Sequence, residues 1–372
     1  MKSEGVKVFA LPVLALAAVL AHAQAPEVVK LGFASPLTGP QAHYGKDNLN
    51  GARLAIDELN TRSLRIGSQA VKFELAVGDD QADPRTGTIV AQQMVDARIR
   101  GMVGHFNSGV TIPASRIYHD AGIPQVTVST NVKYTRQGYR TAFRLMADDD
   151  QQGAALGRYA VGLGFKRLAV IDDRTAYGQG LADAFAAAVK AAGGEVIKRE
   201  YTSDKDFDFR AILTLLRTTK PEAIFFAGYD AQAGPMARQM QELRIKAPLL
   251  GGETMNTAKF LELAGPAAEG HVASTPGAAL EQRPQGKAFA ERYRRTFKEE
   301  IGLYAPYYYD GVMVIAAAMQ KAGSAEPTQY LPELRRIRHA GITADIEFDA
   351  DGNLKQGLLS IFRVQGGKWV LQ

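Results

Sequence analysis

The chain has 372 residues, 46% of them hydrophobic and 22% charged, with a formal net charge of +5. This length and apolar content suffice for two buried cores rather than one. The sequence contains no cysteine, which excludes disulfides, a thiolate nucleophile or metal ligand, and a lipid attached through cysteine. Because no basic run is interleaved with aromatic residues, we expect no nucleic-acid partner.

Residues 1–23 have the pattern of a cleavable signal peptide. Lys2 and Lys7 flank the start of an apolar run over residues 8–20, and Ala21-His22-Ala23 has the small-x-small form that signal peptidase cuts. The apolar run is short for a membrane span. We therefore predict export by a cleavable signal peptide. Without a cysteine for a lipid anchor, we expect a protein that is free in the periplasm.

From residue 28 onwards, apolar runs of strand length alternate with helical runs. The first strand ends at Ser35-Pro36, and a polar loop then leads into a helix whose apolar face is Leu49, Ala52, Ile56 and Leu59. Further strands are predicted at residues 71–77, 99–104, 124–129, 142–145, 167–171, 195–201, 223–227 and 271–274. Helices are predicted at residues 86–97, 152–163, 180–192, 209–217, 235–243 and 307–321. This alternation indicates βαβ units, with parallel sheets covered on both faces.

The α/β series restarts near residues 148–152 and changes character near residues 274–277. We predict an α/β fold of two Rossmann-like lobes joined by a hinge of several crossings, with a cleft between them. Residues 24–148 plus 277–357 are assigned to the first lobe, and residues 149–276 plus 358–372 to the second. The end of the chain, at residues 344–348 and 358–364, is expected to form antiparallel strands around an Asp351-Gly352 turn.

Common catalytic signatures are missing from the sequence. It has no phosphate-binding G-x-x-x-x-G-K-[ST] loop, no G-x-G-x-x-G opening a helix, no H-E-x-x-H and no G-x-S-x-G. The histidines are scattered without metal-ligand spacing, so we predict no metal site, no cofactor and no catalytic residues. Asp79, Asp80 and Asp83 could form a cation-binding or acid–base cluster, but a strand end followed by a helix cap is the favoured interpretation.

A series of short motifs runs through nearly the whole chain after residue 28. They include Leu37-Thr38-Gly39-Pro40, Gly104-His105-Phe106-Asn107-Ser108, Phe143-Arg144, Tyr177-Gly178-Gln179-Gly180, Gly228-Tyr229 and Gly251-Gly252-Glu253. Their order and spacing resemble the periplasmic branched-chain amino-acid (Leu/Ile/Val) binding proteins, which are type I solute-binding proteins of ABC transporters. The resemblance implies two lobes that close on an amino acid with an apolar side chain. It also implies delivery to an inner-membrane permease, and we expect a monomer.

The resemblance further implies which residues bind the ligand. Ser108 matches a serine that binds the carboxylate through its hydroxyl and backbone N–H, and Glu253 matches an acidic residue that pairs with the ammonium. Ser129, Thr130 and Asn131 match a loop whose backbone carbonyl takes the ammonium and whose N–H helps to hold the carboxylate. The remaining positions line or close the cleft, or face the ligand side chain: Asp149, Tyr177, Tyr229, Tyr44 and Tyr304. A buried zwitterion needs such matched partners at both ends.

The ligand class stays open at this point. The best-known members of the family have a threonine where this chain has Asn131, and relatives with the same fold bind amides, aromatic acids or other amino acids. A ligand sensor for a membrane receptor would differ in its partner rather than in its site. An exported hydrolase or lyase that uses Asp79, Asp80 or Glu253 as a base is a further alternative.

Overall fold

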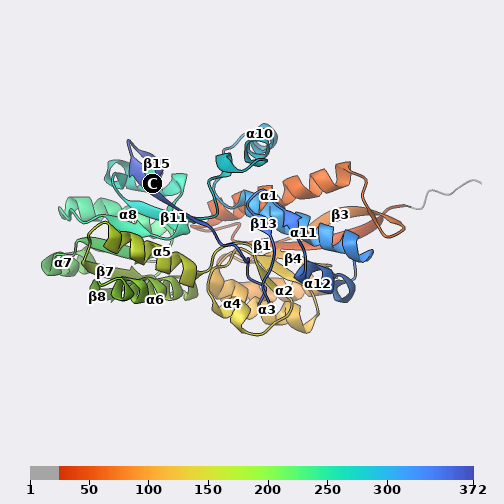
Figure 1. Cartoon of the computed structure of the whole chain (residues 1–372), viewed down its shortest axis with the longest axis horizontal. Helices are drawn as coiled ribbons and strands as arrows, with labels where there is room; N and C mark the ends of the chain where they lie inside the picture. The colour runs from red at the N-terminus through yellow and green to blue at the C-terminus, as the bar shows by residue number, and fades with distance from the viewer. Residues whose placement is uncertain (1–24) are drawn as a thin grey trace, which may run out of the picture.

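The computed structural model describes residues 25–372, and the predicted signal peptide lies outside the described residues. Two α/β lobes lie side by side, each built around one sheet (Figure 1). No helix within residues 25–372 is both long enough and apolar enough to cross a membrane.

The first lobe contains a six-stranded sheet in the order β2-β3-β1-β4-β5-β6. Its strands are β1 (Glu27–Ser35), β2 (Arg65–Ile66), β3 (Gln69–Asp79), β4 (Met102–Gly104), β5 (Gln125–Thr127) and β6 (Ala142–Arg144). All neighbouring pairs are parallel except β2 with β3. A short β12 (His339–Ala340) and β13 (Asp345–Ile346) form a separate antiparallel pair.

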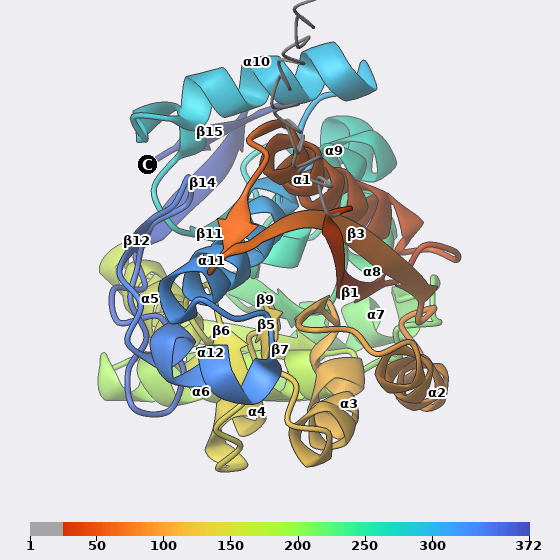
Figure 2. The same ribbon diagram turned by 90° about the vertical axis from the view of Figure 1, so that its right-hand side faces the viewer.

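The helices of this lobe cover both faces of the sheet, except α10, which packs against α1 instead. They are α1 (Ala42–Thr61), α2 (Pro84–Asp96), α3 (Ser108–Asp120), α4 (Lys133–Arg136), α10 (Gly286–Phe297), α11 (Ala305–Ala322) and α12 (Pro327–Arg335). In Figure 1, α1 and α11 lie on one side and α2, α3 and α4 on the other. Figure 2, turned toward the first lobe, shows α10 at the upper edge of the molecule beyond α1. The predicted apolar face of α1 is buried against this core, with Leu49, Ala52, Ile56 and Leu59 at most 8% exposed.

The second lobe contains a seven-stranded sheet in the order β15-β14-β11-β10-β9-β7-β8. Its strands are β7 (Arg167–Asp172), β8 (Glu195–Tyr201), β9 (Ala223–Ala227), β10 (Leu249–Gly251), β11 (Val272–Pro276), β14 (Leu359–Gln365) and β15 (Lys368–Leu371). Its α-helices are α5 (Asp149–Gly162), α6 (Ala176–Ala191), α7 (Arg210–Thr219), α8 (Asp230–Glu242) and α9 (Ala258–Ala264). Short 3₁₀ turns cover Glu253–Met255 and Gly265–Ala268 in this lobe, and a third, Leu280–Gln282, follows β11 and contacts α10.

Both sheets reverse their strand order at one point. In the first lobe, β1 lies between β3 and β4, and in the second lobe β7 lies between β8 and β9. In an open α/β sheet, the loops after the two strands at such a switch point leave a crevice at their carboxyl ends. The two crevices therefore contain the loops that follow β1, β4, β7 and β9.

The predicted alternation of strands and helices is confirmed, and two details of the prediction are wrong. The segment at residues 358–364 does not pair with residues 344–348. Instead β14 pairs with β11 and β15, while β13 pairs with β12. The predicted Asp351-Gly352 turn is present: Phe348 forms an antiparallel bridge with Leu354, and the backbone N–H of Asp349 donates to the carbonyl of Asn353 at 2.8 Å.

The second error concerns α8, which begins at Asp230 rather than at Pro235. The proline lies inside the helix, where its missing N–H removes one backbone hydrogen bond without ending the helix. The predicted start at Pro235 is therefore five residues too late.

The chain passes between the sheets more than once. It leaves the first sheet after β6, returns to the first lobe after β11, and joins the second sheet again at β14. The residue bounds assigned to the lobes from the sequence stay a prediction.

Candidate ligand-binding site

The ten residues predicted to bind ligand are all buried at the facing ends of the two sheets. None is more than 3% exposed. They are Tyr44, Ser108, Ser129, Thr130, Asn131 and Tyr304 from the first lobe, Asp149 at the start of α5, and Tyr177, Tyr229 and Glu253 from the second lobe. Tyr44, Ser108, Tyr177 and Tyr229 follow the strands at the two switch points, β1, β4, β7 and β9. Their roles in binding stay predictions.

Ser108 begins α3, which follows β4 after the short loop at residues 105–107, so the first N–H groups of that helix face the site. Its Oγ accepts hydrogen bonds from the Ser129 hydroxyl at 3.1 Å and from the backbone N–H of Asn131 at 3.2 Å. With two bonds accepted, the hydroxyl hydrogen of Ser108 is left to donate. A donating hydroxyl beside a helix N-terminus is an arrangement suited to a carboxylate.

Arg144, whose side chain is fully buried, holds the loop of Ser129, Thr130 and Asn131 in place by hydrogen bonds to its backbone. Nη1 of Arg144 donates to the carbonyls of Ser129 at 2.9 Å and Asn131 at 3.0 Å. The carbonyl of Thr130 accepts from the backbone N–H of Asp149 at 2.9 Å. Burial lowers the pKa of Arg144 from its ordinary value. This positioning role of Arg144 was missed in the sequence, where Phe143-Arg144 was noted only as part of a motif.

Glu253 follows β10 and two glycines in the second lobe. Its Oε2 accepts from the Tyr177 hydroxyl at 3.1 Å, and burial raises the pKa of Glu253 to about 7. A Cβ at Gly252 would lie 2.3 Å from the Tyr177 hydroxyl, so a glycine there leaves space for this contact. No basic side chain of the described residues pairs with Glu253. The result is a buried acid without a cation beside it.

Asp149 is a second buried acid at the site. Neither of its carboxyl oxygens has a hydrogen-bond partner among the described residues. Burial raises the pKa of Asp149 well above its ordinary value, and the nearby carboxyl of Glu253 raises it further. Ionising a buried carboxyl such as Asp149 or Glu253 costs free energy unless a cation lies beside it. A cationic group on the ligand would supply that partner.

Aromatic rings form the wall beside these polar groups. Tyr44 stacks on Phe106 with ring centroids 5.1 Å apart, and Phe106 meets Tyr304 edge-on at 4.9 Å. Tyr229 completes the group, 5.4 Å from Tyr177 and 6.4 Å from Tyr44. Phe106 was not predicted as a site residue, although its place two residues before Ser108 at a strand end could have indicated it.

The two lobes touch directly across the site. The Tyr44 hydroxyl donates to the Thr254 carbonyl at 2.5 Å, and Nδ2 of Asn107 donates to the Tyr229 hydroxyl at 2.9 Å. Nδ2 of Asn131 donates to the Ala176 carbonyl at 2.5 Å. The arrangement is therefore a closed one. Asn107 and Thr254 were also not predicted, and each is the sequence neighbour of a predicted residue.

Asp79, Asp80 and Asp83, which lie between the end of β3 and the start of α2, each have a partner within the protein. Asp79 accepts from the backbone N–H of Leu37 at 2.8 Å and from the Thr38 hydroxyl at 2.6 Å. Asp83 caps α2 by accepting from the backbone N–H of Thr86 at 2.8 Å. Asp80 is buried with its Oδ2 2.7 Å from Nδ1 of His105. The favoured interpretation, a strand end followed by a helix cap, is confirmed.

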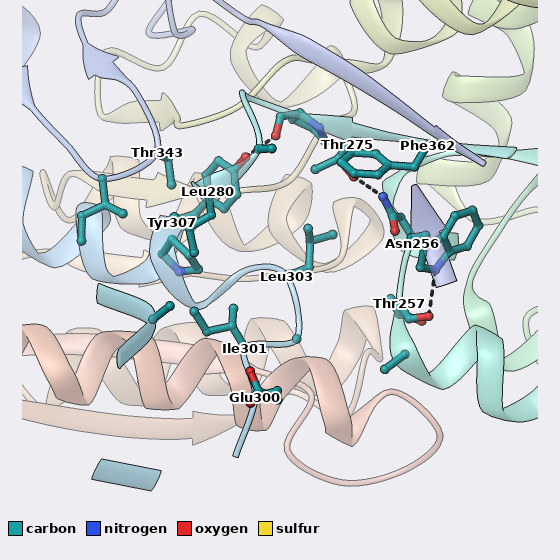
Figure 3. A pocket seen from close by; sticks show the side chains of 18 of the residues that line it. Asn256, Thr257, Thr275, Leu280, Glu300, Ile301, Leu303, Tyr307, Thr343 and Phe362 are labelled. Carbon is teal, nitrogen blue, oxygen red and sulfur yellow. Dashed lines mark hydrogen bonds between the residues drawn. The ribbon is translucent and has the colours of Figure 1, made fainter. Parts of the chain in front are cut away.

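A cavity of about 330 Å³ lies beside the chain crossings, between residues of both lobes. Figure 3 shows Asn256, Thr257 and Phe362 on one side, and Ile301, Leu303 and Tyr307 on the other. None of the ten predicted residues lines it. It is therefore distinct from the candidate site, although Tyr307 is close in the chain to Tyr304.

The family model for periplasmic binding proteins matches residues 28–368. This chain belongs to the periplasmic binding protein family. The resemblance drawn from the short motifs and the expected type I fold of two lobes are thereby confirmed.

Relatives of this periplasmic binding protein match over almost the whole chain. A leucine-, isoleucine-, valine-, threonine- and alanine-binding protein from Pseudomonas aeruginosa is 32% identical over 344 residues, covering 92% of this chain and 91% of that protein. A leucine-binding protein from Thermotoga maritima has a TM-score of 0.86 at 26% identity, covering 92% of this chain and 97% of that one.

A third comparison concerns a structure solved with a ligand. The substrate-binding protein of a branched-chain amino-acid transporter from Streptococcus pneumoniae, in complex with isoleucine, has a TM-score of 0.84 at 26% identity. It covers 93% of this chain and 100% of its own. This chain is thus similar to proteins that are named for the solutes they bind and not for a reaction they catalyse.

Proposed function

We propose that this periplasmic binding protein captures an amino acid with an apolar side chain, of the branched-chain class, and delivers it to an inner-membrane ABC permease. The names of the relatives in Pseudomonas aeruginosa and Streptococcus pneumoniae support this ligand class. The geometry of the site supports it independently of those names.

The proposal rests on one observation: hydrogen-bond donors on the first lobe lie across the cleft from a buried acid on the second lobe. Ser108 and the N-terminus of α3 offer donors for a carboxylate on the first lobe. Glu253 offers a buried acid without a cationic partner on the second. A zwitterion places one charge at each end, and both charges then find partners after they lose water.

The carbonyls of the loop narrow down where the ammonium can also bind. The carbonyl of Asn131 already accepts from Arg144 at 3.0 Å and from the N–H of Tyr134 at 3.1 Å. The carbonyls of Ser129 and Thr130 each accept one protein hydrogen bond and keep a second lone pair. We therefore assign the ammonium to Glu253 and to one of these two carbonyls.

The aromatic rings explain why the side chain of the ligand would be apolar. Tyr44, Phe106 and Tyr304 present ring faces and edges, and apolar area buried against them contributes roughly 25 cal/mol per Å². No basic or acidic group is needed in such a wall to hold an aliphatic side chain.

The proposed protein is a carrier without catalytic activity, which works as a monomer in the periplasm. Closure of the two lobes would couple capture to docking, because only the closed form presents both lobe surfaces in one fixed arrangement. A carrier releases its ligand chemically unchanged, whereas a hydrolase or lyase would release a product.

A thermal-shift screen tests the proposal. Leucine, isoleucine, valine, threonine and alanine would be compared with benzoate and with small aliphatic amides. A ligand at about 100 times its dissociation constant adds roughly 2.7 kcal/mol of stability. Stabilisation by the branched-chain amino acids, with recovery of the intact compound by mass spectrometry, is the expected result.

Two results would reject the proposal. Stabilisation by benzoate or an amide, with no effect of any amino acid, would assign the site to another solute class. Conversion of the bound compound would replace the carrier by an enzyme.

A further inference from the structure

A histidine and an aspartate meet across the cleft outside the predicted ligand contacts. Nε2 of His43, on the first turn of α1, lies 2.8 Å from Oδ2 of Asp230, the first residue of α8. The two residues belong to different lobes and are 187 positions apart in the chain. The His43 side chain is 32% exposed, whereas that of Asp230 is fully buried.

Asp230 is fixed within its own lobe. Its Oδ2 also accepts from the Thr257 hydroxyl at 2.7 Å, and the residue begins α8. Its Oδ1 has no hydrogen-bond partner among the described residues. Burial and the Asp230 carboxyl together raise the pKa of Tyr44 well above its ordinary value, so this tyrosine stays neutral beside it. His43 is therefore the basic side chain that the first lobe supplies to this carboxyl.

His43 contacts Asp230 beside the aromatic residues of the site. Its ring lies 4.0 Å from the ring of Tyr44, and Tyr44 itself bonds across the cleft to Thr254. When the lobes part, His43 moves away with α1 and the Asp230 carboxyl loses this donor. The contact consequently exists only in the closed arrangement.

We infer that His43 and Asp230 form a latch that holds the lobes closed and slows ligand release without touching the ligand. This inference rests on the proposed function. His43 is then a positioning residue, since it acts on the ligand only through the closure of the lobes. A contact made after closure slows dissociation and leaves the association rate unchanged, because the ligand enters the open form.

The chain contains a built-in probe for this motion. Trp369 is its single tryptophan, and Nε1 of Trp369 donates to the carbonyl of Thr257 at 3.1 Å. Trp369 also lines the cavity between the lobes. We therefore expect its fluorescence to change when the lobes open and close, because it lies beside Thr257, the residue that bonds Asp230.

The test compares His43→Ala and His43→Gln with the unmodified protein by stopped-flow fluorescence of Trp369 during leucine binding and release. His119→Ala is the matched control, because His119 lies on α3 and contacts Tyr139 rather than the second lobe. Asp230→Asn is a second variant at the other end of the latch. Urea unfolding of each variant identifies any that fails to fold, and His43 is exposed enough to be replaced without opening the core.

Lobe separation is measured in parallel without relying on any ligand. The absence of cysteine allows a pair of spin labels at Arg116→Cys on α3 and Lys190→Cys on α6. These two helices contact each other between the lobes, so the distance between the labels grows on opening. The measurement is made with and without leucine, in the unmodified and the His43 backgrounds.

We expect His43→Ala to raise the leucine dissociation rate at least tenfold with an unchanged association rate, and to shift the labels toward longer distances. His43→Gln should restore part of the effect, since its amide can still donate to Asp230. Unchanged dissociation and unchanged label distances in His43→Ala would overturn the latch. If leucine does not bind the unmodified protein, the proposed ligand fails, and the label distances without ligand alone decide: longer distances in His43→Ala support the latch and equal distances reject it.

Discussion

Arg144 and Asn131 are joined by a hydrogen bond of 3.0 Å from the buried guanidinium to the backbone carbonyl. The same Nη1 bonds the carbonyl of Ser129, and Nη2 bonds the Thr135 hydroxyl and Oδ1 of Asn353. The side chain of Arg144 thus connects the loop at residues 129–131, which is proposed to help bind the carboxylate, to Asn353 near the end of the chain. The geometry of this loop therefore depends on a buried side chain outside the ten predicted site residues.

Arg144→Ala should therefore reduce both stability and affinity. It leaves several buried acceptors without donors, which costs about 3 kcal/mol or more in the free energy of unfolding. Urea unfolding and calorimetry with leucine measure the two effects. Arg136→Ala is the control, because Arg136 forms an exposed pair with Asp150 and should change little. Equal behaviour of the two variants would contradict the role of Arg144.

Ser108→Ala and Glu253→Ala should each weaken amino-acid binding at least tenfold, about 1.4 kcal/mol. The first removes the hydroxyl proposed to donate to the carboxylate. The second removes the acid proposed to pair with the ammonium. Calorimetry with leucine measures both, and Ser68→Ala, at an exposed position between β2 and β3, is a suitable control. If neither variant changes the dissociation constant, the proposed site is wrong.

Binding should also weaken as the pH falls from 8 to 6. Burial raises the pKa of Glu253 to about 7, so this carboxyl takes up a proton over that range in the ligand-free closed site. An ammonium requires the ionised form, and ligand binding must then release the proton. The apparent affinity is expected to be roughly tenfold lower at pH 6 than at pH 8.

Calorimetry in buffers of different ionisation enthalpy counts the protons released at pH 6.5. Glu253→Gln, which cannot titrate, should bind weakly and show a much flatter pH profile. A pH dependence that persists unchanged in this variant would assign the titration to another group.

The sequence predicted the elements better than their partners. The bounds of β8 (Glu195–Tyr201) and β9 (Ala223–Ala227) match the prediction, because their composition and the turns around them are local signals. The short strand at Leu249–Gly251 was not predicted, since three residues give no periodicity. The pairing of β14 was wrong because an alternating pattern reports burial and not which strand lies alongside.

In the candidate site, too, single positions could be predicted from the sequence but the contacts between distant positions could not. A residue after a strand end, such as Ser108 or Glu253, could be selected because ligands bind at the carboxyl ends of parallel strands. Contacts such as Tyr44 with Thr254 join positions 210 residues apart, and the closing of two lobes is needed to bring them together. No local pattern contains that information, which is why Asn107, Thr254 and Asp230 were missed.

Asp47→Ala should destabilise the protein and disturb the ligand wall together. The buried carboxylate of Asp47 accepts the backbone N–H groups of residues 302–305, at 2.8–2.9 Å, and the Tyr293 hydroxyl at 2.9 Å. It thereby fixes the start of α11 and the backbone of Tyr304. Losing it leaves buried donors unsatisfied, and we expect a loss of at least about 3 kcal/mol in urea unfolding together with weaker leucine binding. Asp57→Ala, at an exposed position of the same helix, should alter neither; if Asp47→Ala were equally harmless, the start of α11 would have to be held by other contacts.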